Sequence, residues 1–131
     1  MVGLDFRISL WVGSRREPPK GYTEINGQRV RLSDQILKGL IEAFENLKGC
    51  EKVEIYLFGS RTRQGAKGGD IDLLVVVPQN WTSSQRFRFK LNLLKEIYKR
   101  LGERKLDVVI VSPDSDLYRE FIKGSVKLWS C

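Results

Sequence analysis

The chain has 131 residues, of which 41% are hydrophobic, so it is long enough for one domain with a buried core. It has no histidine, which excludes serine or cysteine catalysis through a histidine base, and also histidine-ligated zinc. Catalytic chemistry would therefore use carboxylates, hydroxyls, lysines or cysteines, and any metal ion is expected to be a hard cation such as Mg²⁺. The formal net charge of +7 favours anionic partners.

Residues 1–32 are predicted to form a β-rich extension ahead of the core. Residues 4–12 alternate loosely and fit a strand, and Asn26-Gly27 separates two short β-like runs, as in a two-residue hairpin. Charged residues interrupt the apolar start, and no apolar run approaches the length of a membrane span. We therefore expect a cytoplasmic protein without membrane contact.

Two long helices are predicted in the core. The first is capped by Ser33 and is expected to stop at Gly49. The second is capped by Thr82 or Ser83 and runs to about residue 101. The apolar stripe that we expect this second helix to turn toward the core consists of Phe87, Leu91, Leu94, Tyr98 and Leu101.

Three apolar runs predict strands: VEIYLF, IDLLVVV and KLDVVIV. The loop between the first two is too short for a parallel crossover, so these strands should be antiparallel. The helix between the last two is long enough for a right-handed parallel crossover. With a last helix near residues 117–122, the prediction is a single α/β (α+β) domain. Residues 33–131 would form a small mixed β-sheet with helices packed on it, behind the β-hairpin extension.

Three aspartates are predicted to share one edge of this sheet. Asp70 and Asp72 open the second strand and, being two residues apart, point to the same face. Two negative charges at such a short distance repel each other unless a cation lies between them, so a bound divalent ion explains the pair. Asp107 opens the parallel third strand, and the predicted topology brings it to the same edge.

Gly59-Ser60-Arg61 follows the first strand and suits a phosphate-binding turn. Gly59 allows close backbone approach, Ser60 can cap a short helix whose amides face an anion, and Arg61 adds positive charge. Because the first two strands are antiparallel, Gly59 should lie near Asp70. One phosphate-binding loop and three carboxylates are therefore predicted to meet at the same edge of the sheet.

These residues resemble the nucleotidyltransferase superfamily of the DNA polymerase β type, and most closely its minimal nucleotidyltransferases. The family pattern is a hydrophobic strand, Gly-Ser, a spacer, Asp-x-Asp on the next strand, and a third carboxylate one helix later. The matching residues are Gly59, Ser60, Asp70, Asp72 and Asp107. The resemblance covers residues 33–125. It departs from the pattern in a spacer about one residue short and in Gly69, where Ser or Asp often precedes the first aspartate.

The resemblance implies a polymerase β palm-like fold and two-metal transfer of a nucleoside monophosphate, which we expect to be AMP from ATP. Asp70 and Asp72 would hold Mg²⁺ ions on the triphosphate, and Ser60 and Arg61 would hold its outer phosphates. Asp107 would complete the metal site and help to deprotonate the acceptor hydroxyl. Minimal nucleotidyltransferases are often antitoxins that attach AMP to a tyrosine of a small helical HEPN-type toxin, so such a partner is expected.

Other readings of the sequence stay open. A non-catalytic module that blocks a partner by contact, and a transferase acting on a small molecule or an RNA end, are the alternatives. Residues 82–105 carry eight lysines and arginines against two glutamates, a net charge of +6. This segment fits a solvated face or a docking surface for an acidic partner or RNA, although no nucleic-acid-reading motif accompanies it. Cys50 and Cys131 lack a metal-ligand pattern and are expected to be two reduced thiols. The sequence does not define the oligomeric state.

Overall fold

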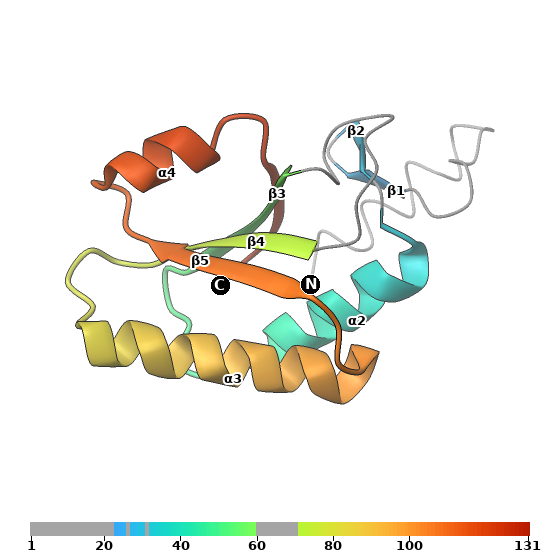
Figure 1. The fold of residues 1–131 in the computed structure, drawn as a ribbon, viewed down its shortest axis with the longest axis horizontal. Coiled ribbons are helices and arrows are strands. Elements are labelled where there is room, and N and C mark those ends of the chain that lie inside the picture. The colour runs from blue at the N-terminus through green and yellow to red at the C-terminus, as the bar shows by residue number, and fades with distance from the viewer. Residues whose placement is uncertain (1–22, 26, 31, 60–70) are drawn as a thin grey trace.

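The computed structural model describes residues 23–25, 27–30, 32–59 and 71–131 (Figure 1). The strand predicted at residues 4–12 lies outside these ranges. Within them, the chain forms a two-stranded hairpin and a four-stranded mixed sheet with helices on both faces. No helix in these ranges is both long enough and apolar enough to cross a membrane.

The sheet is built from β3 (Glu54–Phe58), β4 (Ile71–Val76), β5 (Leu106–Val111) and β6 (Val126–Ser130), in the order β5-β4-β3-β6. β3 and β4 are antiparallel and β4 and β5 are parallel, as predicted. The parallel pair is connected through α3 (Ser83–Leu101). β6 was not predicted; it is antiparallel to β3 and buries Trp129 against Phe44, with 5.8 Å between the ring centroids.

The helices divide between the two faces of the sheet. α2 (Asp34–Glu45) and α3 cover one face, and the short α4 (Asp116–Phe121) covers the other (Figure 1). Ser33 caps α2 as predicted, by accepting a hydrogen bond from the Ile36 amide at 3.2 Å. The helix nevertheless ends at Glu45, before the expected stop at Gly49. Thr82 caps α3 and forms a reciprocal capping box with Gln85.

The predicted core-facing stripe of α3 is wrong at Phe87 and Leu91, although the half-buried Leu94 and Leu101 do pack against the core. The residues buried along this helix are Phe89, Leu93 and Ile97, whereas Phe87 and Leu91 are 63% and 49% exposed. Both sets recur at helical spacing, and periodicity alone does not say which of two stripes faces the sheet. α3 therefore carries one apolar stripe in the core and a second one directed outward.

The hairpin joins β1 (Thr23–Ile25) to β2 (Gln28–Val30), at the predicted place. Ile25 and Val30 are buried in the main core. The buried Thr23 hydroxyl donates to the Leu32 carbonyl at 2.6 Å. The described end of the extension is thus part of the domain core.

The prediction of two reduced thiols is also wrong for this structure, in which Cys50 and Cys131 form a disulfide with 5.9 Å between their Cα atoms. The two residues are 81 positions apart in sequence, but β6 runs antiparallel to β3 and ends beside the turn that precedes it. The Cys131 amide donates to the Val53 carbonyl at 3.0 Å, which fixes this end of the chain. Because β6 was missing from the predicted fold, this proximity was missed as well.

Candidate active site

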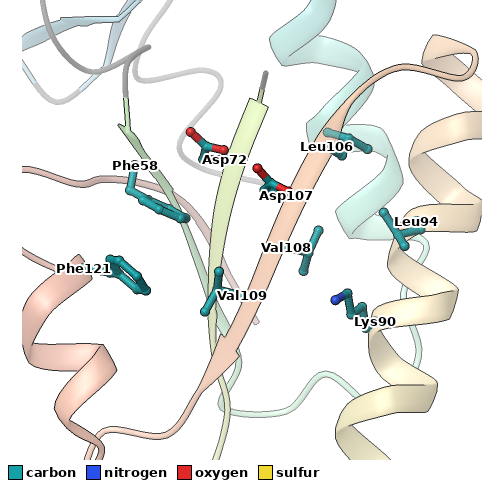
Figure 2. A pocket seen from close by; sticks show the side chains of 9 residues that line it. All are labelled: Phe58, Asp72, Lys90, Leu94, Leu106, Asp107, Val108, Val109 and Phe121. Atoms are coloured by element: carbon teal, nitrogen blue, oxygen red, sulfur yellow. The ribbon is translucent and has the colours of Figure 1, made fainter. Parts of the chain in front are cut away.

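Asp72 and Asp107 are direct neighbours in the sheet. They are paired in the parallel register of β4 and β5, and adjacent strands lie about 4.8 Å apart. Figure 2 shows both carboxylates on the same side of the sheet, at the end where both strands begin. Asp72 is half-buried and Asp107 is exposed, while the rest of β4 is buried. Two of the three predicted carboxylates therefore come together.

Gly59 lies directly against Asp72. It follows β3 with a φ of +84°, in the left-handed region that favours glycine. A Cβ at this position would overlap Oδ2 of Asp72 and would lie 3.1 Å from its Cγ. Gly59 is therefore required both by its backbone conformation and by the space that the Asp72 carboxylate occupies. The sequence placed Gly59 near Asp70, and the structure places it against the second aspartate of the same motif.

Ser60, Arg61 and Asp70 lie outside the described residues. Their assignment to phosphate and metal binding stays a prediction. In the described ranges no group of three acidic or cysteine side chains is arranged to hold a metal ion. The two carboxylates that are described supply the hard oxygen ligands that Mg²⁺ prefers, and like charges so close favour a cation between them. The donor set therefore fits Mg²⁺, with Asp70 as the predicted third ligand.

The carboxylates open into a pocket of about 360 Å³ (Figure 2). One wall is aromatic: Phe58 and Phe121 are stacked, with centroids 5.0 Å apart and planes inclined by 27°. The opposite wall is formed by Lys90 and Leu94, which reach the pocket from α3 beside β5. A flat ring can stack on the aromatic wall, and the ammonium group offers charge to an anion.

The sequence did not assign Phe58, Phe121 or Lys90 to the site. Phe58 immediately precedes Gly59, so its position next to the motif was a usable signal. Phe121 comes from α4, and only the packing of that helix on the sheet brings it to β3. Lys90 was counted in the basic segment, but only the packing of α3 beside β5 brings it to the pocket that Asp72 and Asp107 also line.

Tyr56 lies on the same face of the sheet, deeper in the cluster under α4. Burial, and secondly the neighbouring Glu54 carboxylate, raise the pKa of Tyr56 to about 12. Its hydroxyl donates to Glu54 Oε1 at 3.1 Å. Tyr56 therefore stays protonated at neutral pH and does not act as a base for the site.

Comparison with known proteins gives one family match and several similar solved structures. The family model described as nucleotidyltransferase domain matches residues 37–128. No curated protein matches the chain. Among solved structures, the toxin–antitoxin complex MntA–HepT is similar, with 19% sequence identity, a TM-score of 0.43, and coverage of 73% of this chain and 71% of the other. The complex of tri-AMPylated HEPN toxin and MNT antitoxin from Shewanella oneidensis is also similar, with 22% identity, a TM-score of 0.42 and the same coverage.

The family match extends from α2 into β6 and so includes every strand of the sheet, the Gly59 turn and all three predicted carboxylates. The mixed sheet and its strand order agree with the fold that the sequence resemblance implied. The chain belongs to the nucleotidyltransferase domain family.

Proposed function

We propose that this chain is a Mg²⁺-dependent adenylyltransferase that attaches AMP from ATP to a tyrosine hydroxyl of a HEPN-type toxin, and thereby acts as its antitoxin. The observation that carries the proposal is the Asp72–Asp107 pair, held in register on neighbouring strands and backed by Gly59. Paired carboxylates beside a glycine turn suit transfer of a nucleotidyl group from a triphosphate.

The proposed reaction needs few groups. Asp70, Asp72 and Asp107 would hold Mg²⁺, which supplies charge neutralisation at the reacting phosphates. The acceptor oxygen bonds to the α-phosphorus, the bond from that phosphorus to the oxygen bridging to the β-phosphate breaks, and pyrophosphate leaves. The acceptor proton passes to the Asp107 carboxylate, which is exposed and able to meet an incoming hydroxyl. Ser60 and Arg61 would hold the outer phosphates.

A protein acceptor suits the pocket better than a free small molecule. About 360 Å³ is at the low end for a site that encloses one small ligand, so the volume leaves little room for a second one. The exposed Asp107 faces outward, where a hydroxyl carried on another protein's surface can approach. An acceptor that brings its own surface needs no further binding domain here.

The test is to incubate the full chain with Mg²⁺, each of the four labelled nucleoside triphosphates in turn, and a purified, unmodified HEPN-type toxin. Intact mass should show the partner heavier by one or more AMP groups with ATP, and no gain without Mg²⁺. The double variant Asp72→Asn, Asp107→Asn should give no gain. Neutralisation of the partner by this double variant, without any added mass, would support the non-catalytic binding module instead. Transfer to RNA or to a small molecule would support the third alternative.

A further inference from the structure

The outward stripe of α3 consists of Phe87, Leu91, Leu94 and Tyr98, of which Leu94, on the inner edge of the stripe, also packs against the core. Successive members are 4, 3 and 4 residues apart, the spacing of the apolar seam in packed helix pairs. Phe87 and Leu91 are exposed, and Leu94 and Tyr98 are half-buried. Of the described residues, the only other large exposed hydrophobic side chain is Leu117. The stripe thus gathers most of the exposed large apolar side chains of the described chain on one helix face.

Basic side chains flank this stripe. Arg88 and Lys95 are each three or four residues from Leu91 and are therefore its neighbours on the helix surface, and both are exposed. On the core side of the stripe, Lys90 is half-buried and stands in the same relation to Leu94. The flanks are therefore positive on both sides of the apolar seam.

The acidic side chain on α3 does not neutralise these flanks. Glu96 accepts a hydrogen bond from Arg100 at 2.8 Å and pairs with Lys99 at 3.6 Å. The hydrogen bond from Arg100, with smaller help from Lys99, lowers the pKa of Glu96. It is therefore a carboxylate already engaged with two cations of its own helix.

Charge decides which occupant fits the stripe. A second copy of this chain would bring a further net charge of +7 and the same basic flanks against themselves. A helix with apolar side chains at the same spacing and glutamates or aspartates beside them would pack on the stripe and pair with its flanks. We propose that the outward stripe of α3 is the docking seam for one such acidic amphipathic helix of the partner protein. This inference rests on the proposed function for the identity of that partner.

The seam is continuous with the active site. Leu94 belongs to the stripe and Lys90 to its flank, and both also line the pocket that holds Asp72 and Asp107 (Figure 2). A helix seated along α3 would therefore lie at the edge of that pocket. Docking there brings an acceptor hydroxyl on the same partner close to Asp107, so the seam selects the substrate as well as binding it.

The experiment compares two variants of the full chain. The double change Phe87→Gln, Leu91→Gln alters only exposed side chains of the seam, so folding and thermal stability should be unchanged. The matched control is Leu117→Gln on α4, where the leucine is 53% exposed and outside the seam. The probe is a purified, unmodified HEPN-type toxin, with affinity measured by titration calorimetry. The seam variant should bind more than about tenfold more weakly, and the control should bind like the original chain.

An equal loss in both variants, or no loss in the seam variant, would overturn the proposal. So would sedimentation showing that the original chain dimerises and the seam variant is monomeric, because the occupant would then be a second copy. The affinity of the unchanged chain should also fall as salt is raised, since the flanks are charged. The original chain, compared with the double variant Asp72→Asn, Asp107→Asn, separates the two ideas. Both ideas predict that this variant binds the partner without adding mass to it. If the original chain also binds through the seam and never adds mass, the proposed function fails while the docking seam stands.

Discussion

Replacing Gly59 by alanine is the sharpest test of how the site is built. The new Cβ would meet two separate obstacles: a φ of +84°, and the carboxylate of Asp72. Gly124 provides the matched control, because its φ is +73° and nothing lies within 4 Å of a Cβ built there. Gly124→Ala therefore measures the backbone penalty alone, and Gly59→Ala measures the same penalty plus the collision.

The expected magnitudes follow from these two terms. An alanine in the left-handed region costs about 1–2 kcal/mol relative to glycine. Overpacking against a neighbour that is held in place adds about 1–3 kcal/mol. For a domain of this size, 1 kcal/mol lowers the midpoint of thermal unfolding by about 3–5 °C. Gly124→Ala should thus lower Tm by about 3–10 °C, and Gly59→Ala by about 6–25 °C or, if Asp72 rotates away, by less.

Rotation of Asp72 would relieve the collision by moving its carboxylate away from the β3 side, where Gly59 lies, and so out of its present place in the candidate metal site. Mg²⁺-dependent ATP binding, measured by calorimetry, should therefore weaken by more than about tenfold in Gly59→Ala, whichever way the collision is relieved. Gly124→Ala should bind ATP as the original chain does. If the two variants matched in both Tm and ATP affinity, the close contact between Gly59 and Asp72 would have no part in the site.

Three further outcomes are expected. Asp107→Asn should keep ATP affinity within about tenfold of the original and slow AMP transfer by about a hundredfold or more, measured by rapid-quench kinetics. If ATP affinity and the transfer rate fell equally, Asp107 would be chiefly a ligand of the nucleotide-bound metal ion. Gly39→Ala should stabilise the fold by about 1 kcal/mol through its higher helix propensity, but only when Leu101 is also replaced by alanine. In the original chain a Cβ at position 39 would lie 2.5 Å from Leu101 Cδ2. If the two changes had additive effects on the free energy of unfolding, this explanation would be refuted. Glu96→Gln should lower the urea midpoint at pH 7, and this difference should shrink as the pH is lowered below the ordinary carboxyl value of 4.5. The hydrogen bond from Arg100 lowers the pKa of Glu96 in the folded chain, so its contribution is present above 4.5 and is lost as pH falls through the folded value. A difference that does not change with pH would contradict this.

The β3-β4-β5 part of the sheet was predictable because loop length constrains strand direction. Eleven residues, 60–70, separate Gly59 from β4, which leaves no room for a crossover helix, whereas the 19 residues of α3 span one. Those two connections alone fix an antiparallel and a parallel neighbour for β4. The pairing of Asp72 with Asp107 then follows from the parallel register.

β6 was not predictable in the same way. Its five residues are short, and its partner β3 is about 70 residues away in sequence. Only the tertiary pairing explains why Trp129 is buried and Cys131 lies beside Cys50. Within the candidate site, the position of Phe121 was not predictable for the same reason, because it reaches Phe58 through the packing of α4 on the sheet. Pattern within one segment carries little information about such long-range neighbours.

In the proposed complex, the outward stripe of α3 connects partner docking with nucleotidyl transfer. Asp107 is exposed, and β5, which carries it, lies at one edge of the four-stranded sheet. Water at that edge weakens the electrostatic effect of the carboxylates and competes with an acceptor hydroxyl. In the proposed complex, a helix on the stripe covers the side of the pocket formed by Lys90 and Leu94 and excludes part of that water. The contact that recognises the partner would then also strengthen the electrostatic interactions used in transfer. A chain without its partner would have the catalytic groups in place but exposed to solvent, so rapid transfer would require the docked protein.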